Sequence, residues 1–201
     1  MKESTKQIYR SYDHDQMNFD ILINAVNETK DLYGVVIECG TGKGVGTKMI
    51  IEALSNTETK FYSVDNYPLY KGGDINPYEG ATHPLMHDGE FYRVTKDRTL
   101  EQLNRRAKAF HCHFVQINQD DIYFCKKTKD EVKLAFIDSE HSLEHVIKLA
   151  VHLTPKVVEG GMMVFDDVQC YDHSIVDEFM YHQGFDIAQV GDFKISYRRG
   201  P

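Results

Sequence analysis

The chain has 201 residues, of which 41% are hydrophobic and 27% are charged, and its formal net charge is −8. This length allows one domain with a sizeable core, so we expect a single domain over residues 1–201. The negative charge repels phosphate backbones and no Lys/Arg-rich run offsets it, which argues against nucleic acid as a partner.

The first residues, MKESTKQIYRSYDHDQ, are polar and lack the apolar core of a signal peptide. No apolar run along the chain reaches the length of about eighteen residues that a membrane helix requires. We therefore expect a cytoplasmic protein that has no membrane partner.

Apolar runs that are typical of buried strands alternate with segments of helical spacing. The expected strands are residues 34–39, 60–65, 113–118, 132–138 and 162–167, and the expected helices are residues 47–54, 99–110 and 142–153. This alternation is typical of βαβ units and predicts a mainly parallel sheet with helices on both faces.

The end of the chain departs from this alternation. A helix is expected over residues 174–183, and the runs FDIAQV and FKISYRR that follow it are separated only by Gly191 and Asp192. A connection this short joins antiparallel strands, so the sheet should close with a hairpin. The expected fold class is α/β, with a Rossmann-like doubly wound sheet that is mainly parallel and carries a C-terminal antiparallel hairpin.

The segment over residues 66–96 fits none of these elements. It contains three prolines, four glycines and four tyrosines. A loop of this length is uncommon within a compact domain and more often forms a lid or a binding loop, so we expect it to cover the substrate. Its two histidines, His83 and His87, are candidates for substrate contact, and a surface insertion without a role is the alternative.

A glycine-rich turn, ECGTGKGVGT, follows the first expected strand and runs from Glu38 to Thr47. A Walker phosphate loop does not fit, because Gly44 stands where that motif requires Ser or Thr after its Gly-Lys pair. The dinucleotide fingerprint does not fit either, because Val45 or Thr47 would take the place of its third small residue. The turn therefore favours another ligand.

The arrangement of Glu38, Gly40, Gly42 and Gly44 matches the turn that commonly binds S-adenosylmethionine: an acidic residue, one spacer and then glycines. Glycines let the backbone approach the amino-acid portion of the cofactor, and the acidic residue helps to hold the turn. Asp65 ends the second expected strand, where a carboxylate can accept hydrogen bonds from both ribose hydroxyls.

Carboxylates also follow the fourth and fifth strands: Asp138 after one, and Asp166 and Asp167 after the other. The carboxyl ends of parallel strands meet at one edge of a sheet, so we expect the three side chains to lie together. Carboxylates in one place repel each other unless a cation lies among them, and oxygen ligands suit Mg²⁺, Mn²⁺ or Ca²⁺. The alternative for the first of these positions is structural: Asp138 or Ser139 could only cap the following helix. His141, three residues after Asp138, has the pKa range of a general base.

The remaining cysteines and histidines predict no second site. The cysteines stand far apart without a CxxC pair, so we expect reduced thiols at Cys39, Cys112, Cys125 and Cys170. A metal site at His111, Cys112 and His113 is disfavoured, because in a strand the cysteine would face away from both histidines. His145 is expected to face solvent.

Taken together, these motifs resemble class I S-adenosylmethionine-dependent methyltransferases, and within them the metal-dependent O-methyltransferases of the catechol and macrocin-type sugar classes. The resemblance extends from about Gly34 to Val168. It rests on the order of IECGTGKG, SVDN, NQDDI, FIDSEHS and FDDV along the chain. Two features depart from the family: Gly46 stands where a serine often contacts the methionine carboxylate, and the 66–96 insertion has no counterpart.

The resemblance implies a role for each matching residue. The cofactor contacts would be Glu38, Gly40, Thr41, Gly42 and Gly44 in the turn, Asp65 at the ribose, and Asn118 and Gln119 at the adenine. The metal ligands would be Asp138, Asp166 and Asp167, and His141 would be the catalytic base.

The activity that the resemblance implies is in-line methyl transfer from S-adenosylmethionine to a hydroxyl of a small molecule, a sugar or a catechol-like vicinal diol, with Mg²⁺ or else Mn²⁺ or Ca²⁺. A metal-independent small-molecule methyltransferase and a non-catalytic protein that binds S-adenosylmethionine or a nucleotide are the alternatives. An NAD-dependent oxidoreductase is the least favoured class, because the fingerprint fails. A homo-oligomer is compatible with the sequence.

Overall fold

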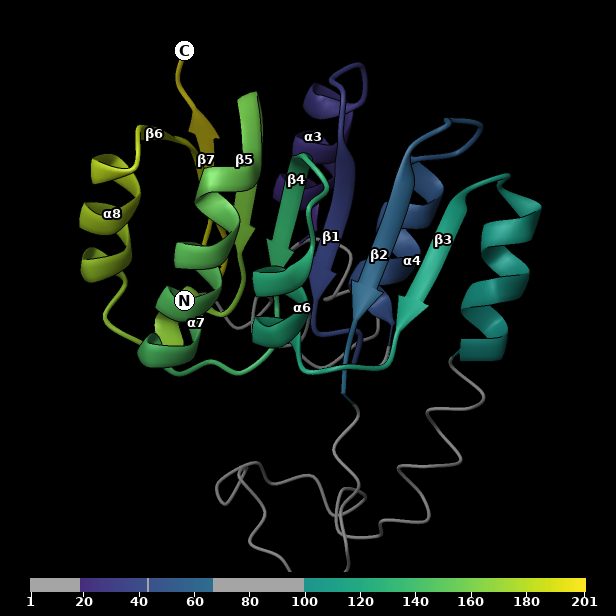
Figure 1. Ribbon diagram of the computed structural model, residues 1–201, viewed down its shortest axis with the longest axis horizontal. Coiled ribbons are helices and arrows are strands. Elements are labelled where there is room, and N and C mark those ends of the chain that lie inside the picture. The colour runs from purple at the N-terminus through teal and green to yellow at the C-terminus, as the bar shows by residue number, and fades with distance from the viewer. Residues whose placement is uncertain (1–18, 43, 67–99) are drawn as a thin grey trace, which may run out of the picture.

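The computed structural model describes residues 19–42, 44–66 and 100–201 (Figure 1). Within these residues seven strands form one sheet: β1 (Val35–Cys39), β2 (Lys60–Val64), β3 (His113–Ile117), β4 (Val132–Ile137), β5 (Val157–Phe165), β6 (Phe185–Val190) and β7 (Ile195–Arg199). The helices are α3 (Asp20–Thr29), α4 (Val45–Ala53), α6 (Asp121–Lys127), α7 (Leu143–Leu153), α8 (His173–His182) and a helix that includes residues 100–109. Short 3₁₀ turns, η1 (Thr154–Lys156) and η2 (Val168–Cys170), flank β5.

The strand order is β3-β2-β1-β4-β5-β7-β6, which confirms the expected doubly wound sheet. The first five strands pair in parallel, and β7 pairs antiparallel with both β5 and β6. The antiparallel pairing of β6 with β7 follows from the short connection between them, which leaves no room for a crossover helix. The arrowheads of β1 to β4 point to the same edge of the sheet in Figure 1.

Helices cover both faces of the sheet, with α6, α7 and α8 on one face and α3, α4 and the 100–109 helix on the other (Figure 1). Strand β4 explains why both layers form, because all six of its residues are buried. Ala135 and Ile137 pack in the core under α7 and α8, whereas Leu134 and Phe136 pack under α3 and α4. An apolar run without polar alternation is typical of a parallel strand covered on both sides.

Two helices of the structure have no counterpart among the expected elements, α3 and α6. The apolar residues of α3 recur at helical spacing and are buried, as at Leu22, Ala25 and Val26. This periodicity is the feature of the sequence from which the helix could have been predicted. Strand β3 begins at His113, so His111 and Cys112 precede it and the strand argument against their metal site does not apply. The 66–96 insertion, with His83 and His87, lies outside the described residues apart from Asn66.

No helix among the described residues is long and apolar enough to cross a membrane.

Candidate functional site

The glycine turn connects the end of β1 to the start of α4 and contains three left-handed glycines. Gly40, Gly42 and Gly44 have φ angles of 93°, 46° and 78°. A Cβ atom on Gly40 would lie 1.9 Å from the backbone oxygen of Asp138, whereas one on Gly42 would meet nothing within 4 Å. Gly40 is therefore required by close packing against the end of β4, and Gly42 leaves one side of the turn open.

Asp65, directly after β2, holds this turn. Its Oδ2 accepts hydrogen bonds from the backbone N–H groups of Thr41 at 3.0 Å and Gly42 at 2.9 Å. Its own N–H donates to the carbonyl oxygen of Ile117 at the end of β3, at 3.0 Å. The expected ribose acid thus lies beside the glycine turn, at the carboxyl edge of three neighbouring strands.

Glu38 lies behind the turn rather than on its open side, and its side chain is buried. Its Oε2 accepts hydrogen bonds from the hydroxyls of Thr47 at 2.7 Å and Ser63 at 2.6 Å. Burial raises the pKa of Glu38 to about 8, although these hydrogen bonds act in the opposite direction. Glu38 therefore joins β1, β2 and α4 as a carboxyl group that retains its proton near neutral pH.

The position of Glu38 also explains Gly46, the residue that departs from the family pattern. A Cβ atom on Gly46 would lie 2.9 Å from Oε1 of Glu38 and 2.8 Å from the ring of Phe136. Cβ contacts below 3.0 Å are essentially never observed, so a serine does not fit here without rearrangement.

The expected adenine residues, Asn118 and Gln119, follow β3 at the same edge of the sheet. Asn118 is exposed and Gln119 is half-buried. Asp120 then caps α6 by accepting a hydrogen bond from the N–H of Tyr123 at 2.7 Å. The segment from 118 to 120 is therefore a short connection between β3 and α6, close in the fold to Asp65.

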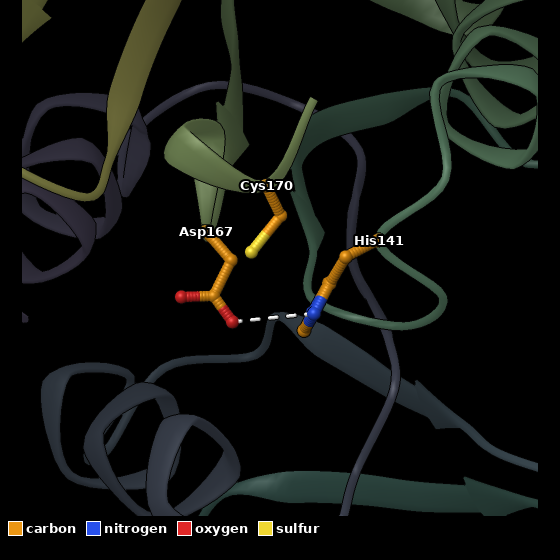
Figure 2. A group of neighbouring side chains, drawn as sticks. All are labelled: His141, Asp167 and Cys170. Carbon is orange, nitrogen blue, oxygen red and sulfur yellow. Dashed lines mark ion pairs between the residues drawn. The ribbon is translucent and has the colours of Figure 1, made fainter. Parts of the chain in front are cut away.

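His141 lies between two of the expected metal ligands. Its Nδ1 is 3.3 Å from Oδ2 of Asp167, and its Nε2 is 3.7 Å from Oδ1 of Asp138. Figure 2 shows the imidazole reaching toward the Asp167 carboxylate, with the Cys170 sulfur nearby. The donor atoms of His141, Asp167 and Cys170 all lie within 4.8 Å of one another.

Both members of the Asp138–His141 pair have shifted pKa values. Burial, together with the charge of Asp166, raises the pKa of Asp138 to about 7. The Asp138 carboxylate in turn raises the pKa of His141, and the charge of Asp167 acts in the same direction. His141 is therefore a stronger base than a free imidazole.

Asp166 has a partner that the sequence did not indicate. Its Oδ1 lies 2.7 Å from Nζ of Lys194, and both side chains are less than 10% exposed. The signal in the sequence was weak, because Lys194 stands in an apolar run, FKIS, where a lysine at a strand start is ordinarily solvated.

Asp167 has a strained backbone, with a φ angle of 49°. A non-glycine residue in this region costs about 1–3 kcal/mol and persists only where its surroundings hold it. The conformation directs the Asp167 carboxylate toward His141, and the N–H of Asp167 donates to Oδ1 of Asp166 at 2.8 Å.

The three expected carboxylates do not bring their ligand atoms together: among the described residues, the group whose ligand atoms lie within 4.8 Å of one another is His141, Asp167 and Cys170. Asp138 and Asp167 lie beside opposite nitrogens of the His141 imidazole, and carboxylate oxygens are the ligands that Mg²⁺ and Mn²⁺ prefer. The third expected ligand, Asp166, is already paired with the ammonium group of Lys194.

The expectation that His145 faces solvent is wrong. Its side chain is only 14% exposed, because the start of α7 packs against α6. Nε2 of His145 lies 3.0 Å from Oδ2 of Asp121 and 3.1 Å from the Ser139 hydroxyl. The His145 side chain therefore links the start of α6, at Asp121, to the loop after β4, at Ser139.

The fold also brings together two cysteines that are distant in the sequence. The sulfur atoms of Cys39 and Cys125 lie 3.5 Å apart in the core, and both side chains are free thiols.

The model of the methyltransferase domain family matches residues 37–168, which span β1 to the start of η2 and include every expected site residue. The chain belongs to the methyltransferase domain family. With its seven-stranded sheet and glycine turn, it is a class I S-adenosylmethionine-dependent methyltransferase. No curated protein sequence matches the chain.

Solved structures resemble the methyltransferase over most of its length. CalS11, a TDP-rhamnose 3'-O-methyltransferase of calicheamicin biosynthesis, has a TM-score of 0.64 and 14% identity, covering 92% of this chain and 80% of that chain. The O-methyltransferase NovP has a TM-score of 0.62 and 13% identity, covering 92% of this chain and 80% of NovP. An rRNA methylase from Streptococcus thermophilus has a TM-score of 0.56 and 11% identity over 90% and 95%. At identities this low, the structural similarity establishes a shared fold and nothing about the acceptor. The acceptors that the names give also differ: TDP-rhamnose for CalS11 and rRNA for the methylase.

Proposed function

We propose that this methyltransferase transfers the methyl group of S-adenosylmethionine to a hydroxyl of a small molecule, a sugar or a vicinal diol, with the help of a divalent cation. The observation that carries the proposal is the position of His141 between Asp138 and Asp167, at the same edge of the sheet as the glycine turn. A sugar hydroxyl is favoured because CalS11 is named a TDP-rhamnose 3'-O-methyltransferase. A small acceptor is also consistent with the net charge of −8, which disfavours a polyanionic substrate.

The cofactor would be held by the glycine turn and by the two connections beside it. Its residues are Gly40, Thr41, Gly42 and Gly44 in the turn, supported from behind by Glu38, then Asp65 at the ribose, and Asn118 and Gln119 at the adenine. The open side of Gly42 supports this placement, because the backbone there can approach a ligand without a clash. When bound, S-adenosylmethionine supplies an electrophilic methyl group.

His141 would remove the proton of the acceptor hydroxyl. Its Nδ1 lies 3.3 Å from Asp167, whereas its Nε2 is buried, lies 3.7 Å from Oδ1 of Asp138 and makes no hydrogen bond among the described residues. This arrangement favours the tautomer in which Nδ1 donates to Asp167 and Nε2 carries the lone pair. For Nε2 to accept the proton, the acceptor hydroxyl would have to reach this buried atom beside Asp138, and Asp167 would then stabilise the imidazolium that results.

The divalent cation would be held at this edge by Asp167, whose carboxylate oxygen lies within 4.8 Å of other ligand atoms, with Asp138 on the other side of His141. A cation here supplies Lewis acidity, which lowers the pKa of an acceptor hydroxyl. The two carboxylates would also orient His141 beside the acceptor, which places the base before any proton moves.

Asp65→Asn is expected to raise the Kd for S-adenosylhomocysteine at least about tenfold, because a charged acceptor of ribose hydroxyls is replaced by an amide. Calorimetric titration measures this change, and Asp186→Asn on the exposed strand β6 is the matched control. Asp65 also holds the turn, so urea unfolding is measured in parallel. Unchanged affinity in Asp65→Asn would remove this residue from the cofactor site.

His141→Gln is expected to lower kcat by about 10²–10⁴-fold while the affinity for S-adenosylhomocysteine stays unchanged, because a general base is lost and the cofactor turn is intact. Transfer of a labelled methyl group to a panel of nucleotide sugars and catechols measures this effect. His182→Gln on the exposed face of α8 is the matched control. Equal turnover in His141→Gln and the control would exclude His141 as the base.

A second candidate, the same transfer without a divalent cation, is favoured by one observation: Lys194 already pairs with Asp166. The same assay separates the two candidates when it is repeated with Mg²⁺ and with EDTA. Loss of turnover in EDTA that Mg²⁺ restores supports the cation, whereas equal turnover in both supports the metal-independent enzyme.

A further inference from the structure

Three side chains of different chemistry converge at the carboxyl edge of the sheet. The ligand atoms of His141, Asp167 and Cys170 all lie within 4.8 Å of one another, and Nδ1 of His141 is 3.3 Å from Oδ2 of Asp167. Figure 2 shows the Asp167 carboxylate and the Cys170 sulfur on the same side of the imidazole. One nitrogen, one oxygen and one sulfur are therefore available to a single ion between them.

The backbone fixes two of these ligands relative to each other. Asp167 precedes the 3₁₀ turn η2 and Cys170 ends it, and the N–H of Cys170 donates to the carbonyl oxygen of Asp167 at 2.8 Å. The side-chain amide of Gln169 donates to Oδ1 of Asp167 at 3.0 Å, which leaves Oδ2 directed toward His141. Hydrogen bonds of this kind orient a carboxylate that binds a metal ion.

The mixture of donor atoms selects the kind of cation. Mg²⁺ and Ca²⁺ are bound by oxygen atoms, whereas a thiolate and an imidazole are typical ligands of Zn²⁺. Ligand atoms in a tetrahedral zinc site lie about 3.3–3.6 Å apart, a separation that the His141–Asp167 pair already has. The side chain of Cys170 is exposed and can rotate toward the same point. Three protein ligands leave the fourth position open to water.

We propose that His141, Asp167 and Cys170 bind Zn²⁺, and that Zn²⁺ bound there inhibits methyl transfer. A cation on Nδ1 leaves the proton of the neutral imidazole on Nε2, 3.7 Å from Oδ1 of Asp138. Nε2 then has no lone pair with which to remove a proton from the acceptor. Zn²⁺ also takes the Asp167 carboxylate from the cation of the proposed function. The inhibition rests on the proposed function, whereas the binding of Zn²⁺ does not.

Titration of CoCl₂ into the reduced full chain tests the binding site. Co²⁺ accepts the same ligands as Zn²⁺, and a bound thiolate adds a sulfur-to-cobalt charge-transfer absorption in the near ultraviolet. We expect this absorption in the wild type, and we expect Zn²⁺ to abolish it by displacing Co²⁺. In Cys170→Ser the absorption is expected to be lost, and the Kd for Zn²⁺ to rise at least about tenfold, because one ligand is weakened.

Cys112→Ser is the matched control, because Cys112 is a free cysteine that precedes β3, at the opposite edge of the sheet. This variant is expected to give the wild-type absorption and the wild-type Kd for Zn²⁺. Absence of the charge-transfer absorption in the wild type overturns the zinc site, as does its persistence in Cys170→Ser. Circular dichroism reports whether each variant retains its fold.

The inhibition is measured in the methyl-transfer assay with Mg²⁺ present. Half-maximal inhibition of Cys170→Ser is expected to need at least about tenfold more Zn²⁺ than that of the wild type or Cys112→Ser. Equal sensitivity of all three proteins overturns inhibition through this site. Absence of turnover in all three proteins without Zn²⁺ contradicts the proposed function instead, and the cobalt absorption still decides whether the zinc site exists.

Discussion

Gly40→Ala is expected to lower the free energy of unfolding by about 3 kcal/mol or more and to abolish binding of S-adenosylhomocysteine. The added Cβ would lie 1.9 Å from the backbone oxygen of Asp138, and the φ angle of 93° is unfavourable for any side chain. Backbone atoms cannot rotate away, so either the turn or the end of β4 must shift. Urea unfolding followed by circular dichroism measures the loss.

Gly42→Ala is the matched control for this prediction. Its φ angle of 46° lies in the left-handed region, but a Cβ atom there would meet nothing within 4 Å. We expect a loss of about 1 kcal/mol from backbone strain alone. Weaker binding of S-adenosylhomocysteine in Gly42→Ala, out of proportion to this loss, would support contact between the open side of the turn and the cofactor. Equal destabilisation by both substitutions would contradict the role of the Gly40 contact.

Glu38→Gln is expected to remove a large pH-dependent component of stability. In the folded protein burial raises the pKa of Glu38 from 4.5 to about 8, so between these values the folded state retains a proton that the unfolded state releases. The contribution of Glu38 is therefore fully present below about pH 4.5 and is lost as the pH rises toward 8, by up to about 4 kcal/mol.

Glutamine cannot ionise, so the stability of Glu38→Gln relative to wild type should increase steadily from pH 5 to pH 8. Urea unfolding at several pH values measures this difference. Buried acids that do not interact with Glu38 contribute to both proteins and cancel in the comparison, whereas Asp138, whose charge raises the pKa of Glu38, adds a smaller part of the difference. Glu58→Gln, at an exposed position, is expected to leave the pH dependence unchanged. A constant difference between wild type and Glu38→Gln over this range would contradict the protonation of Glu38.

The sequence alone predicted most of the order of strands and helices and the position of the glycine turn. Apolar periodicity distinguishes strands from helices, and the two residues between FDIAQV and FKISYRR leave only an antiparallel hairpin, so the sheet topology followed from local patterns. Strand ends in a parallel sheet share one edge, which is why Asp138 and Asp166 follow neighbouring strands at the edge where they were expected. The sequence analysis did not predict the helices α3 and α6, and only for α6, with seven residues, is the run short.

Only the tertiary structure decided which partners these residues have. Lys194 pairs with Asp166, and Asp121 with His145, through contacts between elements that no local spacing relates. Gly46 is glycine because Glu38 fills the space beside it from a neighbouring element. The physical reason is that a sequence pattern records which face of an element is apolar and where the chain turns, whereas the neutralisation of a buried charge depends on which side chains the packed layers bring within a few ångströms.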